Sequence, residues 1–108
     1  MNVYDRWLFE LWHGDYAVAE EIIADGFVGH WPDREVQGRE ALVDLVRETR
    51  AMFASLTFTL ELGPFGDELI AARWAGEGVE PNVRLLGHDL LRLQGGRIAE
   101  YWVVSWSS

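Results

Sequence analysis

The sequence predicts an α+β protein in which helices pack on one face of an antiparallel sheet. Apolar residues recur every three or four positions in the first half of the chain and every second position after Ser55, which are the periods of helices and strands. The pair Gly95-Gly96 separates the last two alternating segments, and two glycines suit the positive φ angles of a type I′ hairpin turn. Helices followed by hairpin-connected strands are typical of the α+β class.

Three helices are expected. The first covers about residues 3 to 13, with its apolar residues on one stripe. A short second helix begins after Asp15, its N-cap, and stops at Asp25-Gly26. The third begins after Gly38 and carries the next apolar stripe. The segment "GHWPDREVQG", residues 29–38, is interpreted as a loop that turns into this third helix.

Four strands follow the helices. They are expected at residues 57–62, 69–77, 83–94 and 97–107, where apolar and polar residues alternate. A two-residue loop sets the register of the last hairpin, because Gln94 then pairs with Arg97.

In that register, one face of the sheet is aromatic and apolar with a single histidine. The residues expected on this face are Ala72, Trp74, His88, Leu90, Tyr101 and Val103. Asp89 falls on the opposite face, diagonal to Arg73, where an ion pair between the two is expected. That second face also carries large apolar groups such as Trp102 and Trp106. Contiguous exposed apolar surface usually marks an interface, so we expect a homodimer formed through this outer sheet face.

Length and charge narrow the classes of function. The chain has 108 residues, 49% of them hydrophobic, and is expected to form one domain over residues 1–108. Its net charge of −9 repels phosphate backbones and anionic membranes, so neither nucleic acid nor a membrane is expected as a partner. With no cysteine, no charged leader and no long apolar run, a cytoplasmic location is expected.

Three stretches carry a resemblance to a known family. "GHWPDREVQGREALVDLV", "DELIAARWAGEG" and "GHDLLRLQGGRIAEYW" resemble successive motifs of the SnoaL-like polyketide cyclase family, within the nuclear-transport-factor-two-like superfamily. The resemblance extends over about residues 4 to 106. It implies a cone-shaped α+β barrel of three N-terminal helices packed on a strongly curved antiparallel sheet. It also implies a dimer and a deep apolar cavity for a small hydrophobic molecule.

The same resemblance directs attention to Val103. Cyclases of the family use an aspartate in the last strand as acid/base, usually just after the tryptophan of E-x-W, and Val103 stands at that position here. The remaining candidates for proton transfer are His30 and His88, because a buried neutral histidine can act near neutral pH. The competing interpretation is that each is a wall or core residue satisfied by one hydrogen bond. His13, before Gly14, is interpreted as a residue favoured by the helix C-terminus.

Aromatic and apolar residues are expected to form the ligand-binding walls, because flat rings suit flat organic ligands. These residues are Trp12, Phe27, Trp31, Trp74, Leu90, Tyr101 and Val103. Neither a cofactor nor a metal is expected, since no H-x-H or H-E-x-x-H spacing occurs.

Two functional hypotheses follow. The first is an enzyme that performs cofactor-independent acid/base catalysis, of the isomerase or lyase kind, on a small hydrophobic carbonyl or aromatic compound. The second is a non-catalytic dimeric ligand-binding protein that has lost the family's catalytic aspartate. Two retained histidines favour the first hypothesis, and Val103 favours the second.

Overall fold

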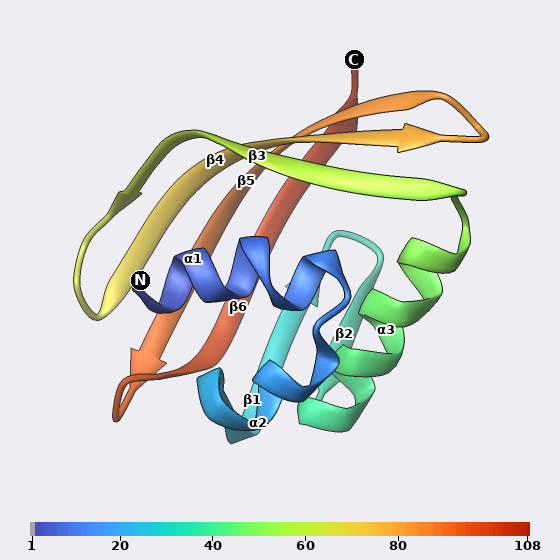
Figure 1. The fold of residues 1–108 in the computed structure, drawn as a ribbon. Helices are drawn as coiled ribbons and strands as arrows, with labels where there is room; N and C mark the ends of the chain where they lie inside the picture. The colour runs from blue at the N-terminus through green and yellow to red at the C-terminus, as the bar shows by residue number, and fades with distance from the viewer. Residues whose placement is uncertain (1) are drawn as a thin grey trace.

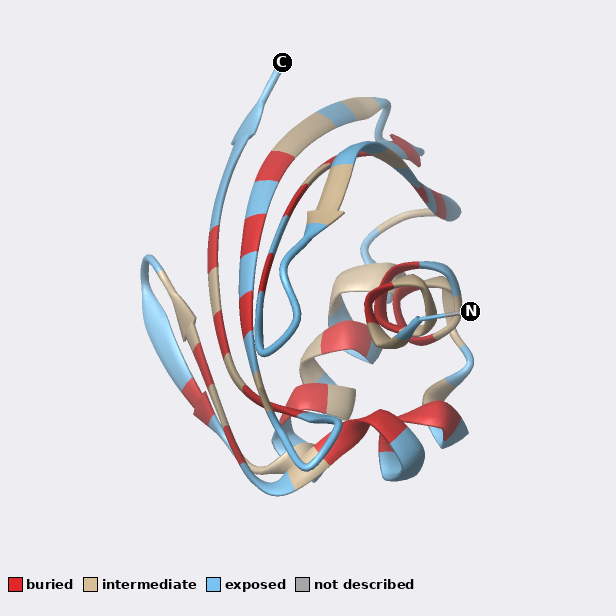
Figure 2. Ribbon diagram, turned by 90° about the vertical axis from the view of Figure 1, so that its left-hand side faces the viewer, coloured by how far each residue is buried: buried red, intermediate tan, exposed pale blue. Residues whose placement is uncertain are grey.

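The computed structural model describes residues 2–108 and forms a six-stranded sheet that curves around its helices (Figures 1 and 2). The helices are α1 (Val3–Phe9), α2 (Ala19–Ile22) and α3 (Arg39–Ala51), with 3-10 turns η1 (Leu11–His13) and η2 (Tyr16–Val18). The strands are β1 (Ile23–Trp31), β2 (Arg34–Gln37), β3 (Ser55–Phe65), β4 (Leu69–Val79), β5 (Val83–Gln94) and β6 (Arg97–Ser107).

The strand order across the sheet is β2-β1-β6-β5-β4-β3. Every neighbouring pair is antiparallel except β1 with β6, which run parallel. The helices lie within the concave side of the curved sheet, as the side view shows (Figure 2). The predicted α+β class, with three helices against a curved sheet, is therefore confirmed.

The core lies between this concave face and the helical stripe. Tyr4, Trp7 and Leu8 of α1 are buried, as are Leu42 and Val46 of α3. Complete burial of a large apolar side chain stabilises the folded state by about 1.5–3 kcal/mol. These few side chains therefore hold both helices on the sheet.

The segment after α2 differs from the prediction. Residues 23–37 form the β1–β2 hairpin, in which Trp31 pairs with Arg34 across a two-residue turn. A second helix reaching residue 25 and a loop over residues 29–38 were expected, so both expectations are wrong. Gly26 and Gly29 remove two side chains from the alternating pattern, and a short strand with such gaps is difficult to distinguish from a loop.

The last hairpin turn is as predicted, but its register is not. Gln94 pairs with Arg97, and Gly95 and Gly96 have φ angles of 60° and 79°. Just beyond the turn, Leu93 pairs with Ile98 and Arg92 with Glu100, so Ala99 is an extra residue in a β-bulge.

The bulge shifts the register between β5 and β6 by one residue from the predicted one. Asp89 pairs with Val103 and His88 with Val104, in place of the expected Asp89–Trp102 and His88–Val103 pairs. The β4–β5 pairing is shifted likewise, so that Ala72 pairs with Asp89 and not with His88. Because side chains alternate between faces, a slip of one residue exchanges the faces of every side chain on β5.

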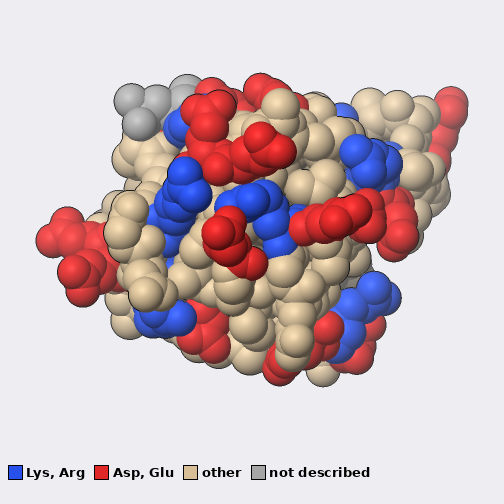
Figure 3. Space-filling view, turned by 90° about the horizontal axis from the view of Figure 1, so that it is seen from below, with Lys and Arg blue, Asp and Glu red and all other residues tan. Residues whose placement is uncertain are grey.

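Acidic and basic side chains lie beside one another on the side of the molecule that is seen from below (Figure 3).

None of the helices within residues 2–108 has both the length and the apolar character needed to cross a bilayer.

Candidate functional site

A buried carboxylate lies on the concave face of the sheet. Asp89 of β5 is only 3% exposed and accepts three hydrogen bonds. The hydroxyl of Tyr4 donates to Oδ2 at 2.8 Å. Nε1 of Trp74 and the hydroxyl of Tyr101 donate to Oδ1 at 2.9 and 2.5 Å.

Three separate elements bring these donors together. Tyr4 comes from the first turn of α1, whose N-cap Asn2 accepts a hydrogen bond from the backbone N–H of Asp5. Trp74 comes from β4 and Tyr101 from β6, the two strands that flank β5. Helix and sheet are thus joined through one carboxylate, which fixes the carboxylate in place.

A glycine on β5 makes room for the indole of Trp74. A Cβ atom at Gly87 would lie 2.1 Å from Cζ2 of Trp74, far inside van der Waals contact. The ring therefore lies flat against the backbone of β5, and its Nε1 reaches Asp89 two residues further along the strand.

Burial dominates the electrostatics of this site. It raises the pKa of the Asp89 carboxyl, and the hydrogen bonds from Tyr101, Trp74 and Tyr4 oppose this rise without cancelling it. Burial and the nearby Asp89 charge also raise the pKa values of Tyr101 and Tyr4 well above that of an ordinary tyrosine. Both phenols consequently remain protonated donors, and the carboxyl is the group of this cluster that can exchange a proton.

Asp89 forms part of the wall of an aromatic cavity beneath the helices. The cavity has an empty volume of about 450 Å³, part of it open to solvent. Its lining residues are Trp7, Leu8, Trp12, Trp31, Phe58, Trp74, Leu85, Asp89, Tyr101, Val103 and Ser105. Asp89 is the one acidic residue in this lining, which contains no arginine or histidine. Such a pocket, largely apolar with a single ionisable acid, is typical of small-molecule sites.

Five of the seven expected wall residues lie in this lining: Trp12, Trp31, Trp74, Tyr101 and Val103. Phe27 is fully buried behind them and packs against Trp7, with ring centroids 6.5 Å apart. Leu90 lies on the outer face, 37% exposed, because the Ala99 bulge reverses the faces of β5. The expectation that Leu90 contributes to the cavity is therefore wrong.

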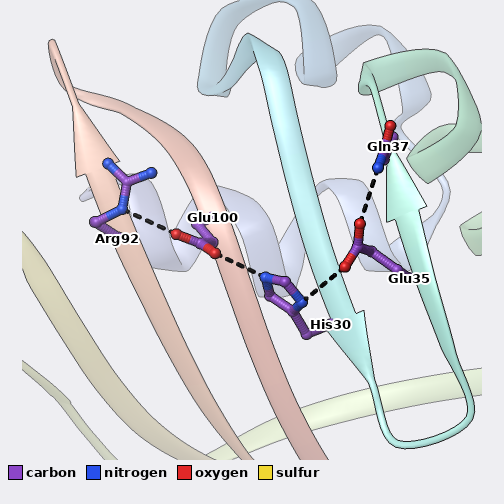
Figure 4. A network of polar contacts seen from close by, with 5 residues as sticks. All are labelled: His30, Glu35, Gln37, Arg92 and Glu100. Carbon is purple, nitrogen blue, oxygen red and sulfur yellow. Dashed lines mark hydrogen bonds and ion pairs between the residues drawn. The ribbon is translucent and has the colours of Figure 1, made fainter.

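His30 lies on the outer face of the sheet, so the expectation that it faces the cavity is wrong. Its Nε2 donates to Oε2 of Glu100 at 2.7 Å, and its Nδ1 lies 3.4 Å from a carboxylate oxygen of Glu35 (Figure 4). The ring stacks on Trp102 at 5.4 Å between centroids. Trp31, the next residue of β1, points inward instead, because consecutive strand residues alternate between faces.

His88 is also on the outer face, exposed and edge-on to Trp106 at 5.2 Å between centroids. It was expected inside, and the bulge again accounts for the error. His13 has a structural position: its Nδ1 donates to the carbonyl of Leu8 and its Nε2 accepts from the backbone N–H of Phe58. None of the three histidines lines the cavity.

Asp89 lies on the opposite face of the sheet from the one predicted. Arg73 pairs with Glu61 at 3.0 Å on the outer face, so the expected Arg73–Asp89 ion pair is absent from the described residues. Asp89 instead pairs with Val103 across the strands, so the cavity has a carboxyl group beside the position where the resemblance places an aspartate. Its i±2 neighbours Gly87 and Leu91 are buried on the same face, but Leu86 and Leu90 give the other face of β5 a similar apolar pattern, so the sequence carried no sign that separated the two faces.

Within residues 2–108, no group of three or more His, Asp or Glu side chains lies close enough together to bind an ion.

A known family and solved structures match this chain over nearly its whole length. The family model of the SnoaL-like domain matches residues 4–101, and a comparison with curated proteins finds no match. A Jannaschia sp. CCS1 protein assigned to the SnoaL-like polyketide cyclases superposes with a TM-score of 0.86 at 17% identity, covering 95% of this chain and 82% of its own.

Two further solved structures show the same architecture. IdmH of Streptomyces antibioticus, assigned as a polyketide cyclase, gives a TM-score of 0.81 at 21% identity over 95% of this chain and 88% of its own. An NTF2-like protein of Exiguobacterium sp. 255-15 gives 0.78 at 18% identity over 99% of this chain and 100% of its own. At these identities the likeness shows the fold and leaves the reaction open. The match over residues 4–101 together with this fold shows that the chain belongs to the SnoaL-like domain family.

Proposed function

We propose that this protein binds a small, largely apolar carbonyl or aromatic compound in the aromatic cavity and exchanges a proton with it through Asp89, without a cofactor. The observation that carries the proposal is the position of Asp89. It is the one acidic residue in an otherwise largely aromatic lining, and three donors hold it in place.

The chemistry that fits this geometry is enolisation. A carboxylate oxygen of Asp89 removes a proton from the carbon next to the ligand carbonyl, the C–H electron pair becomes the enolate, and the carboxyl returns the proton to the same or another carbon. A raised pKa suits this role, because a general acid/base is most effective when its pKa approaches the working pH. The assignment transfers the proton-handling role from His30 and His88 to Asp89.

A non-catalytic binding protein is the second candidate. It is favoured by the hydrogen bonding of Asp89, since three donors already occupy its oxygens and the lining holds no histidine that could act as a second proton carrier. In that case Asp89 orders the aromatic walls and recognises a polar group of the ligand.

Hydrogen–deuterium exchange of ketone ligands separates the two candidates. A panel of cyclic ketones in D₂O is followed by NMR for loss of the protons next to the carbonyl, with wild type, Asp89→Asn and the outer-face variants His30→Gln and His88→Gln. We expect wild type and both histidine variants to catalyse exchange, and Asp89→Asn to be slower by about 100-fold or more, since general acid/base catalysis contributes roughly 10²–10⁴.

Tryptophan fluorescence on the same samples reports binding, because four tryptophans line the cavity. Binding by wild type without exchange of any ketone would establish the second candidate. Absence of both binding and exchange would refute the proposal as a whole.

A homodimer through the outer sheet face is part of this proposal. Leu90, Val104 and Trp106 are 37%, 57% and 41% exposed on the adjacent strands β5 and β6. A second copy that covers them would leave the cavity on the opposite face accessible.

A further inference from the structure

Asp89 is buried without a countercharge. Within residues 2–108, the ion pairs of the arginines and histidines involve other acidic residues, and none reaches Asp89. The two nearest cationic candidates along β4 and β5, Arg73 and His88, are on the outer face. An ionised buried carboxylate is normally paired with a positive charge, so Asp89 lacks a charged partner among residues 2–108 whenever it loses its proton.

The neutral donors leave part of the carboxylate available. An ionised carboxylate has about four lone-pair positions on its two oxygens. Trp74 and Tyr101 donate to Oδ1 and Tyr4 donates to Oδ2, and the indole of Trp7 is a further, weaker donor to the same carboxylate. Asp89 lines the cavity, so a ligand that reaches a remaining lone pair of its carboxylate meets an acceptor, and the complementary group is a donor or a positive charge.

The walls around this acceptor are aromatic on several sides. Phe58 packs edge-to-face against both Trp12 and Trp74, with centroids 5.8 and 5.4 Å apart. On the β1–β6 side, Trp31 packs edge-to-face against Tyr101 at 5.2 Å. Rings at steep angles to one another present π surfaces in different directions, and these surfaces attract cations, most strongly in tryptophan.

We propose that the ligand of this cavity carries a small organic cation, an alkylammonium group, enclosed by the tryptophans with its positive charge directed to Asp89. The inference rests on the proposed function only in taking this cavity as the ligand site. The cation supplies the missing countercharge, and its alkyl substituents contact the rings. The net charge of −9 raises the local concentration of cations around the protein.

The test compares two probes that share a shape and differ in charge: choline and its neutral isostere 3,3-dimethyl-1-butanol. Binding is measured by tryptophan fluorescence and by the shift in Tm at constant ionic strength. We expect wild type to bind choline at least tenfold more tightly than the alcohol. We expect Asp89→Asn, which keeps the shape and removes the charge, to reduce that preference to less than twofold.

Two controls exclude a general attraction to a negatively charged surface. Asp67→Asn removes the same charge from an exposed turn and should retain the full preference for choline. Trp12→Leu removes one aromatic wall and should weaken choline binding more than alcohol binding. This second variant also tests the proposal if Asp89→Asn does not fold.

The outcomes distinguish this inference from the proposed function. If the alcohol or a neutral ketone binds wild type as tightly as choline, the cation inference is wrong and the proposed function stands. It is equally wrong if Asp89→Asn keeps the preference. If no probe of either kind binds, both proposals are wrong.

Discussion

At Asp89 a carboxylate, an indole and two phenols meet in a space nearly closed to water. Each neutral donor stabilises the ionised carboxylate, while burial disfavours it. Because burial is the larger effect, the folded state holds the proton of Asp89 more tightly than the unfolded chain does. The residue is thus a cost to folding when ionised and a usable proton carrier for the same reason.

The difference in free energy of unfolding between wild type and Asp89→Asn should depend on pH, because the variant lacks the ionisable group. A carboxyl whose folded pKa is raised contributes its stability below the unfolded pKa and loses it as the pH rises through the folded pKa. The free energy of unfolding of wild type should therefore fall relative to Asp89→Asn between pH 4 and pH 8. Urea unfolding of both proteins across this range measures the difference, with Asp67→Asn, which retains Asp89, as an exposed control that should keep the fall seen in wild type. A wild type that gains stability relative to Asp89→Asn as the pH rises would contradict the burial argument.

At the scale of elements, β4 and β5 act as a pair in which one glycine of β5 makes room for one aromatic ring of β4. Gly87 lies directly opposite Trp74, and the ring occupies the space of a missing Cβ. This pairing, together with the Ala99 bulge in β6, decides which side chains of β5 face the cavity.

Gly87→Ala should damage the site without touching Asp89 directly. The added methyl group would push the indole of Trp74 away from Gly87 and lengthen its hydrogen bond to Asp89. We expect the free energy of unfolding to fall by about 1–3 kcal/mol, as in other overpacked cores. Gly26→Ala on β1 is the matched control, because a Cβ there meets no atom within 4 Å and should change stability by less than about 0.5 kcal/mol. Chemical unfolding measures both, and near-ultraviolet circular dichroism reports the tryptophan environment. Equal stability of the two variants would show that the ring can move at no cost.

At the scale of the whole molecule, the curved sheet has two faces with different roles. The helices lie on the concave side of the sheet (Figure 2), and residues from both line the cavity. Leu90, Val104 and Trp106 are exposed to solvent on the other face. Ion pairs border this apolar area on both sides, with Arg92–Glu100 next to His30 (Figure 4) and Arg73–Glu61 toward β3. An apolar centre with a polar rim is the usual anatomy of a protein interface.

Light scattering after size-exclusion chromatography tests the dimer. Wild type at about 100 μM should elute with twice the 12.3 kDa mass of one chain, and Val104→Glu should shift it to the monomer because a charge would be buried at the interface. Glu77→Gln on β4, outside the apolar centre, should leave the mass unchanged. A monomeric wild type at this concentration would rule out the second copy as the cover of the outer face.

Much of the architecture could be predicted from local patterns. The helical stripe of α1 and α3, the four long strands and the Gly95-Gly96 turn follow from periodicity and glycine chemistry, which depend on near neighbours in the chain. The β1–β2 hairpin could not be predicted in this way, because its pattern is interrupted at Gly26 and Gly29 and its pairing with β6 is long-range.

The site was predictable in its walls and not in its chemistry. Trp12, Trp31 and Trp74 line the cavity as expected. Trp12 lies on the apolar stripe of the first helix, which points inward whether or not a strand pairing is known. His88 and Asp89 depended on the register of β5, and one extra residue in β6 was enough to place them on the wrong faces. His30 was placed wrongly because the β1–β2 hairpin was expected to be a loop.

By itself, the sequence determined the α+β class, the order of the helices and of the four long strands, and the aromatic character of the cavity, because these depend on composition and period. Only the tertiary structure decided that Asp89, and neither His30 nor His88, faces that cavity. The physical reason is that an alternating strand specifies two faces without specifying which is buried. That choice is made by the Ala99 bulge and by the hydrogen bonds from Tyr4, Trp74 and Tyr101, which come from three different elements.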